Sequence, residues 1–182
     1  MIERKKTLNV FRDAREAWGS YDDFPVGQPG VDPMPHLSRN RCAQPFWLVS
    51  EADQVLVHMA GRGRIEFRDV EPAALELVPG DTVYIPACVP SRLVPAGEVV
   101  QVRLKAEPAV REAVAWFCAC GALVRSDDIA AGAVAQARYL EAVRAFNASA
   151  AARTCGACGA VHEPADLGDI AWERTAAAIR AG

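Results

Sequence analysis

Four cysteines in the C-terminal third of this 182-residue chain have a spacing that suits a metal ion. Cys118 and Cys120 form one close pair, and Cys155 and Cys158 form a second pair about 35 residues later. A glycine directly follows each pair, and its conformational freedom lets the backbone fold so that both thiolates face one point. Four thiolates suit tetrahedral zinc or a mononuclear iron. We therefore predict one Zn or Fe at this four-cysteine site, in a structural role, because four protein ligands leave no open coordination position.

The first pair departs from the usual spacing of such a site. Cys118-Ala-Cys120 has one residue between its cysteines, whereas the second pair has two. Backbone strain is one expected consequence, and a changed ligand set with His162 as an alternative donor is another. A third interpretation is that the cysteines are the unmetallated remainder of a decayed site.

Composition and charge exclude several classes of partner. The formal net charge is −3, and the basic residues are scattered without a stripe of interleaved aromatic residues, so we expect no nucleic acid partner. No apolar run approaches the roughly 20 residues that span a bilayer, so we expect no membrane partner. The charged N-terminus lacks the apolar segment of a signal peptide, which favours a cytoplasmic protein. In that reducing compartment, paired cysteines indicate metal ligands before disulfides.

The residue pattern, and with it the predicted secondary structure, changes twice along the chain. Residues 1–20 have a helical spacing of apolar residues, and a Pro/Gly-rich connector covers 24–35. Short apolar stretches between turn residues predict strands at 46–49, 54–59, 61–67, 74–77, 82–86 and 99–105. Helical stretches are predicted at 109–116, 127–150 and 167–180. These features predict an N-terminal helical segment (1–23), an all-β sandwich or barrel (24–108) and a C-terminal extension with the four-cysteine knuckle and helices (109–182).

The β-stretch also has the turn spacing of a cupin, a jelly-roll-like barrel. Gly61 lies seven residues after Gln54, as in the first cupin motif, and Gly80-x5-Pro86-x4-Ser91 reproduces the spacing of the second. We therefore predict an all-β cupin with a small C-terminal α-helical and metal-knuckle extension.

A cupin followed by a four-cysteine knuckle resembles bacterial 3-hydroxyanthranilate 3,4-dioxygenase over roughly residues 24–160. The matching residues are Phe24-Pro25-Val26-Gly27, Gly61, Gly80-Asp81-x-x-x-Ile85-Pro86, Trp116-Phe117-Cys118 and Cys155-Gly-Ala-Cys158. The resemblance implies a pocket for an aromatic carboxylate, ring opening by iron held by two His and one Glu, and a second iron in a rubredoxin-like knuckle.

The catalytic ligands of that family are not matched. Gln54 stands at the glutamate position and Ser91 at the second-motif histidine, while Leu48 and Ser50 fall near the first-motif histidines. These side chains cannot replace the imidazoles and carboxylate that hold Fe(II). We therefore expect no catalytic iron in the barrel, although ordinary iron-dependent ring cleavage stays open as the less favoured alternative.

Other residues of the barrel could still do chemistry. Period-2 alternation points His58 inward if Gln54 points inward, and it puts Gln101, Arg103 and Lys105 on one face of their strand. The resemblance puts Arg103 at a substrate-contacting position and Arg39 and Arg41 on a carboxylate-binding segment. The candidate catalytic residues, for acid–base or thiolate chemistry, are His58, Cys88 and Arg103; the candidate substrate-binding residues are Arg39, Arg41, Gln54 and Gln101.

Each candidate also has an ordinary structural explanation. His58 could be a hydrogen-bonded core residue, and Cys42 and Cys88 small buried apolar residues. Arg103 and Lys105 could line the solvent face of an edge strand.

Two functions follow from these residues. The first is a repurposed cupin enzyme that acts on a small aromatic or amino-acid-derived carboxylate, an anionic ligand that suits the cationic strand. The second is a non-catalytic ligand-binding or regulatory cupin. A homodimer is expected in either case, since cupins often pair through their sheets.

Overall fold

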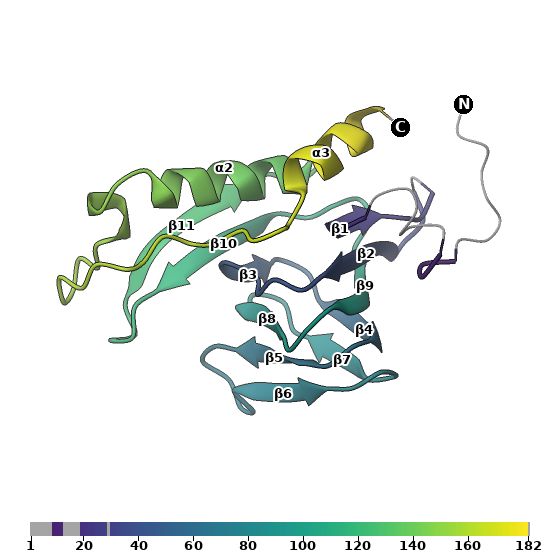
Figure 1. The fold of residues 1–182 in the computed structure, drawn as a ribbon, viewed down its shortest axis with the longest axis horizontal. Coiled ribbons are helices and arrows are strands. Elements are labelled where there is room, and N and C mark those ends of the chain that lie inside the picture. The colour runs from purple at the N-terminus through teal and green to yellow at the C-terminus, as the bar shows by residue number, and fades with distance from the viewer. Residues whose placement is uncertain (1–8, 13–18, 29, 182) are drawn as a thin grey trace.

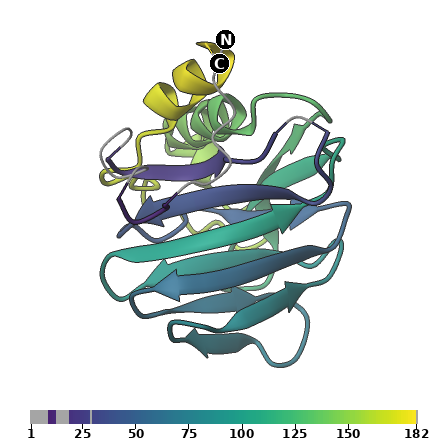
Figure 2. The same cartoon turned by 90° about the vertical axis from the view of Figure 1, so that its right-hand side faces the viewer.

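Two antiparallel sheets packed face to face form the body of the protein (Figure 1). The computed structural model describes residues 9–12, 19–28 and 30–181. The first sheet has the strand order β1-β2-β9-β4-β7 and faces the viewer in Figure 2, and the second has the order β11-β10-β3-β8-β5-β6. Strands adjacent in sequence often lie in different sheets, as in a jelly roll. The predicted all-β, jelly-roll-like fold with a C-terminal helical extension is confirmed.

The elements follow one another with short connections. The first sheet is built from β1 (Tyr21–Pro25), β2 (Met34–Asn40), β4 (Gln54–Ala60), β7 (Thr82–Ile85) and β9 (Val99–Lys105). The second is built from β3 (Trp47–Ser50), β5 (Gly63–Phe67), β6 (Ala74–Leu77), β8 (Ser91–Pro95), β10 (Glu112–Phe117) and β11 (Leu123–Ile129). The helices are α2 (Ala135–Asn147), a short 3₁₀ turn (Ala151–Arg153) and α3 (Trp172–Ala181).

The strands and the last two helices predicted from the sequence are present, but two expectations were wrong. The stretch 109–116 was expected to be helical, yet it contains β10, which pairs with both β3 and β11. The six-stranded sheet therefore continues past residue 108 into the expected C-terminal extension. Of the helix expected over 1–23, residues 1–8 and 13–18 lie outside the described residues, and Tyr21–Pro25 forms β1.

Gly61 shows why the cupin turn spacing has a physical basis. Its φ is +84°, a conformation that side-chain-bearing residues rarely adopt. A Cβ at this position would stand 2.2 Å from the backbone oxygen of Glu98, so no side chain fits. The glycine thus lets β4 turn into β5 directly beside the start of β9.

The helices close one end of the sandwich. Tyr139, Ala142, Val143 and Phe146 recur at helical spacing, so they form the buried face of α2. Phe146 stacks on Trp116 of β10 with ring centroids 4.4 Å apart. A second apolar cluster, including Leu56, Ile65, Leu77, Ile85 and Leu93, fills the space between the two sheets further from the helices.

No helix in the described part of the chain is both long and apolar enough to cross a bilayer.

Candidate functional site

The four cysteines converge at the far end of the β10–β11 hairpin. Their sulfur atoms all lie within 4.8 Å of one another. The sulfurs of Cys118 and Cys158 are 3.5 Å apart, and those of Cys120 and Cys155 are 3.7 Å apart. Sulfurs at the corners of a tetrahedron around zinc, with Zn–S bonds of 2.3 Å, are separated by about 3.8 Å. The cluster therefore has the dimensions of a four-thiolate metal site.

The shorter first pair is accommodated by a tighter turn. In the second pair, the amide of Gly159 donates to the carbonyl of Cys155, four residues earlier, over 2.9 Å. In the first pair, the amide of Gly121 donates to the carbonyl of Cys118, three residues earlier, over the same distance. The β10–β11 register also shifts between Trp116 and Phe117, directly before the pair. One residue is thus removed from the turn without moving the sulfurs out of the cluster.

The local backbone favours a thiolate in this cluster. Backbone N–H groups of Cys158 and Ala157 point at the sulfur of Cys155 and lower the pKa of that thiol to about 7. His162 is not part of the cluster. Its backbone N–H instead donates to the carbonyl of Arg153, so these two residues pair on either side of the Cys155–Cys158 turn in the sequence. The donor set that fits a metal is therefore the four cysteines alone.

The positions of the cupin iron ligands lie in the barrel but carry other side chains. Leu48 and Ser91 are buried and stand opposite each other on β3 and β8. Gln54 is buried at the start of β4. Among the described residues, the group of His, Cys, Asp or Glu close enough to hold a metal is the four-cysteine cluster.

The space between the sheets is nearly filled. Its cavity, bordered by Leu48, Gln101 and Arg103, has a volume of about 30 Å³. A void of that size holds about one water molecule. Asn40 faces this cavity with a buried Oδ1 that has no hydrogen-bond partner among the described residues, which suits a bound water. A substrate does not fit in the barrel centre.

The inward face of β9 carries the charge of the barrel. β9 is a central strand between β2 and β4, and its residues Gln101, Arg103 and Lys105 are all buried. The alternative that Arg103 and Lys105 line the solvent face of an edge strand was therefore wrong. Arg103 Nη1 donates a hydrogen bond to Gln54 Oε1 over 2.9 Å.

Lys105 is the centre of a buried ionic network. Its Nζ lies 2.6 Å from Asp23 Oδ2 and 2.8 Å from Glu112 Oε1. Glu112 also accepts from Gln54 Nε2 over 3.3 Å and from the Tyr139 hydroxyl of α2 over 2.6 Å. The network thus ties both sheets to the helix that covers them.

The charges in this network hold each other in their ionised forms. Burial would raise the pKa of the Asp23 carboxyl, but Lys105, His36 and Arg103 together outweigh burial, and the pKa lies well below its usual value. Burial would lower the pKa of Lys105, but Asp23 and Glu112 outweigh it and raise that pKa. Burial also raises the pKa of Tyr139 well above 10, and the charge of Glu112 adds to this effect. At neutral pH Asp23 and Lys105 therefore form a charged pair.

A β-bulge in β1 brings the aspartates inward. The β1–β2 register shifts between Tyr21 and Phe24, and Asp23 has a φ of +56°. Both Asp22 and Asp23 consequently border the barrel interior, although consecutive strand residues normally face opposite sides. Burial, and then the neighbouring charge of Asp23, raises the pKa of the Asp22 carboxyl.

A cleft opens beside this network. Its volume is about 530 Å³, within the range of small-molecule sites. Its mostly apolar walls come from the chain segments 106–110 and 129–135. The polar residues that border it are His36, Ser50, Gln54, Lys105, Glu107, Glu112 and Gln136.

The structure separates the predicted catalytic residues. His58 is fully buried, accepts from Gln101 Nε2 over 2.9 Å, and donates from its Nε2 to the Gly61 carbonyl over 3.0 Å. Cys88 is exposed, and its side chain borders a shallow surface hollow with Arg111 and Asp128. Arg103 lines the interior cavity. The three residues therefore do not border one common cavity.

The predicted substrate-binding residues divide into two groups. Gln54 and Gln101 are in the barrel, where Gln54 reaches the cleft and Gln101 borders the interior cavity. Arg39 is buried on the face of β2 opposite to Ser38 and Asn40, which border the interior cavity. It pairs with Glu98 over 2.6 Å. Arg41 is exposed and pairs with Asp169 over 3.0 Å. The two arginines do not border the cleft.

Several residues of the site were missed by the sequence analysis. Asp23 and Glu112 lie in stretches that were expected to be helical, and Tyr139 belongs to a helix with no predicted link to the barrel. The strict alternation of 99–105 was the available signal, because it placed Lys105 on the same face as Arg103.

Comparison with known proteins gives similarity at the level of fold. No protein-family model matches the chain, and no curated protein matches it. A solved hydroquinone 1,2-dioxygenase, PnpCD, has a TM-score of 0.47 and 17% identity, over 54% of this chain and 71% of that one. A cupin-2 domain protein from Shewanella frigidimarina has a TM-score of 0.47 and 19% identity, over 56% of this chain and 96% of that one. The hydroquinone 1,2-dioxygenase from Sphingomonas sp. TTNP3 has a TM-score of 0.45 and 15% identity, over 54% and 72%.

Proposed function

We propose that the protein is a cupin that binds a small amino-acid-derived or aromatic carboxylate in the cleft beside Lys105 and Glu112. The observation that carries the proposal is the 530 Å³ cleft with a charged network at its inner end. The barrel centre is too small for such a ligand, with a cavity of about 30 Å³. The ligand site therefore lies at the end of the barrel and not at the position of the cupin iron.

The polar groups at the inner end of the cleft suit a ligand that carries both an amine and a carboxylate. Glu112 accepts three hydrogen bonds from protein groups, and a carboxylate has about four acceptor sites. It can therefore accept another N–H from a ligand amine. The three N–H groups of Lys105 already face Asp23, Glu112 and Tyr139, so the lysine supplies positive charge beside the cleft. The imidazole of His36, which also borders the cleft, can donate a hydrogen bond to a ligand carboxylate. The apolar walls suit an aromatic or aliphatic body between these two ends.

We propose that the four-cysteine site holds zinc or a mononuclear iron in a structural role. Four protein thiolates would complete a tetrahedral shell, so a substrate would find no open position. The metal would fix the residues after Cys158 to the β10–β11 hairpin. The ligand cleft and the metal site would then be separate functional parts.

Binding is the primary proposal because the candidate catalytic residues do not share a cavity and because Asp23 and Lys105 hold each other in their charged forms. A repurposed enzyme is the second candidate. It is favoured by His36 and Glu112, a base and a carboxylate that border the same cleft. It predicts that a bound amino-carboxylate is converted to a product detectable by mass spectrometry, and that His36→Gln abolishes conversion while retaining binding.

Calorimetric titration with 2-aminobenzoate, benzoate and aniline tests the primary proposal. We expect 2-aminobenzoate to bind at least roughly tenfold more tightly than either simpler compound, since a hydrogen bond to a charged group is worth that factor or more. Glu112→Gln should lower the affinity for 2-aminobenzoate by a similar factor. Glu76→Gln, on the exposed edge strand β6, is the matched control and should bind like the wild type. Absence of saturable binding, or wild-type affinity in Glu112→Gln, would overturn the proposal.

A further inference from the structure

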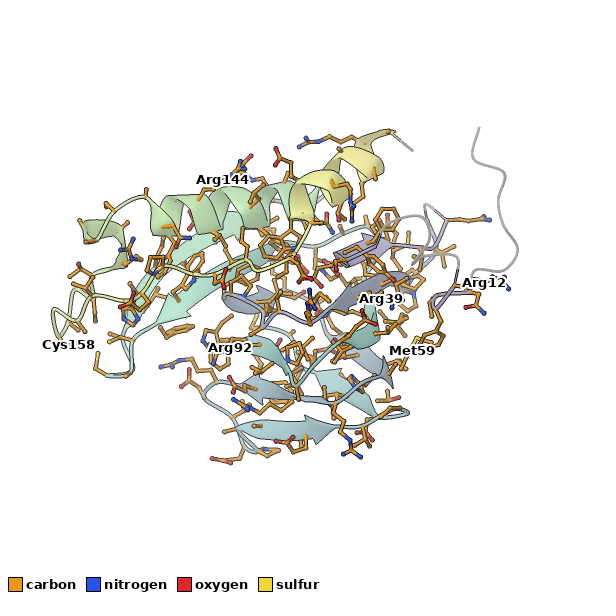
Figure 3. The ribbon with its side chains drawn as sticks, in the orientation of Figure 1. Arg12, Arg39, Met59, Arg92, Arg144 and Cys158 are labelled. Atoms are coloured by element: carbon orange, nitrogen blue, oxygen red, sulfur yellow. The ribbon has the colours of Figure 1, made fainter. Side chains whose placement is uncertain are left out.

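A second recess lies near the cysteine cluster, away from the cleft beside Lys105. Its volume is about 270 Å³. It lies where β3, β8 and β10 meet the chain segment 162–165 that follows the cysteines. Figure 3 shows Arg92, which borders it, on the same side of the molecule as Cys158. It shares no lining residue with the cleft beside Lys105.

The walls of this recess are aromatic and held in place by packing. Trp47 and Phe117 meet edge to face with centroids 6.5 Å apart. The Arg92 guanidinium lies over the Trp47 ring, 4.9 Å from its centroid. Trp116 is stacked on Phe146, and its indole N–H donates to the carbonyl of Pro45 over 2.8 Å. These rings present a rigid apolar surface before any ligand arrives.

Three polar groups at the recess have unused hydrogen-bonding capacity. Within the described residues, the Nε2 atom of His162 is shielded from solvent and has no partner. Arg92 donates from Nε and Nη2 to Glu66, and its Nη1 makes no hydrogen bond to the part of the chain that the structure describes. Glu163 is exposed and, in the same part of the chain, forms no ion pair. The recess thus offers a donor at Arg92, an acceptor at Glu163 and, in its lining, an imidazole with an unpaired nitrogen.

This combination selects a narrow class of ligand. A simple aromatic acid would use Arg92 but would leave Glu163 facing its negative charge. A cation would meet Glu163 but would approach the guanidinium of Arg92. A neutral planar heterocycle with both N–H donors and ring acceptors in its plane can use both groups while it stacks against the aromatic and guanidinium planes.

We propose that this recess, bordered by Trp47, Arg92, His162 and Glu163, binds the heterocyclic base of a nucleobase or nucleoside. The base stacks against the Trp47–Arg92 pair, with its in-plane donors and acceptors toward His162 and Glu163. The site is independent of the carboxylate cleft, and its ligand is a single small molecule and not a nucleic acid strand.

Titration of the metal-loaded protein with adenosine, guanosine, ribose and benzoate tests the proposal, with binding followed by calorimetry. We expect saturable binding of at least one nucleoside, and no binding of ribose at the same concentrations. Trp47→Leu and His162→Ala should each lower the affinity for the nucleoside at least roughly tenfold. His162→Ala guards against a folding defect in Trp47→Leu, and circular dichroism verifies the fold of both.

Glu112→Gln distinguishes this site from the carboxylate cleft. It should leave nucleoside affinity unchanged, whatever it does to 2-aminobenzoate. Three results would overturn the proposal: no saturable nucleoside binding, wild-type nucleoside affinity in folded His162→Ala, or benzoate binding as tightly as the best nucleoside.

Discussion

Arg103 donates a hydrogen bond to Gln54 over 2.9 Å inside the barrel, at the position where the dioxygenase resemblance would put an iron-binding glutamate. A guanidinium has only donors, so it pairs with the amide oxygen and leaves the amide nitrogen for Glu112. The positive charge of this barrel is therefore supplied by β9 side chains. The same contacts fill the space that a metal and its substrate would need.

The first prediction concerns the metal content of the protein. We expect elemental analysis of protein purified under reducing conditions to find about one zinc or iron per chain, since one four-thiolate cluster is present. Cys155→Ser should abolish it. Cys88→Ser and Gln54→Ala are the controls and should retain it, because neither residue touches the cluster. Two equivalents in the wild type, with one retained in Cys155→Ser, would show that the barrel binds a metal.

The second prediction concerns the ion pair between Asp23 and Lys105. Asp23→Asn leaves a buried ammonium with only one carboxylate, so we expect a loss of about 3 kcal/mol in the free energy of unfolding at pH 7. Because the pKa of Asp23 is lowered in the folded protein, its contribution is fully present above the unfolded value near 3.9. It is lost as the pH falls through the folded value.

Denaturant unfolding at pH 7 and pH 3 measures this effect. The difference between the wild type and Asp23→Asn should shrink at the lower pH. The raised pKa of Lys105 keeps its own contribution through the neutral range, and that contribution is lost only as the pH rises through the folded value, above about 10.4. An equal stability difference between wild type and Asp23→Asn at both pH values would mean that the mutation acts through packing and not through charge.

The third prediction uses a pair of glycines. Gly61→Ala introduces a Cβ at positive φ, 2.2 Å from a backbone oxygen, so we expect a loss of more than about 2 kcal/mol in stability. Gly97→Ala is the matched control, since a Cβ there meets nothing within 4 Å and its φ is not positive. It should be neutral or slightly stabilising, because alanine restricts the unfolded chain. Thermal unfolding of both variants provides the comparison, and similar melting temperatures would contradict this account.

The sequence was sufficient for the parts of the fold that depend on local signals. The alternation in 99–105 located β9 and its polar face, and the glycine and proline spacing located the turns after β4 and β6. The convergence of the four cysteines was also predicted, because each pair has the short spacing and the following glycine that are typical of a metal knuckle. The turns and strand faces follow from residues close in sequence, and the cysteine pairs form a recognisable motif.

The rest of the site depends on long-range contacts that no local pattern reveals. β10 is rich in alanine and is a strand because it pairs with β3 and β11, which overrides its helical propensity. The inward turn of Asp23 requires a bulge whose partner is β2. The meeting of Lys105 with Glu112 and Tyr139 joins two sheets and a helix, so it follows from tertiary packing alone.

The last prediction concerns the link between helix α2 and the barrel. The hydroxyl of Tyr139 is buried and donates to Glu112 Oε2 over 2.6 Å. Tyr139→Phe keeps the ring but removes this donor, and so leaves a buried carboxylate oxygen with one fewer partner. We expect a loss of about 2 kcal/mol in the free energy of unfolding, the usual cost of an unsatisfied buried polar group. Tyr84→Phe is the control, because Tyr84 is 58% exposed on the edge strand β7 and water replaces its hydroxyl contacts. Denaturant unfolding of the two variants gives the comparison. If both variants matched the wild type, Glu112 would obtain its hydrogen bonds elsewhere and the Tyr139 hydroxyl would not hold α2 on the barrel.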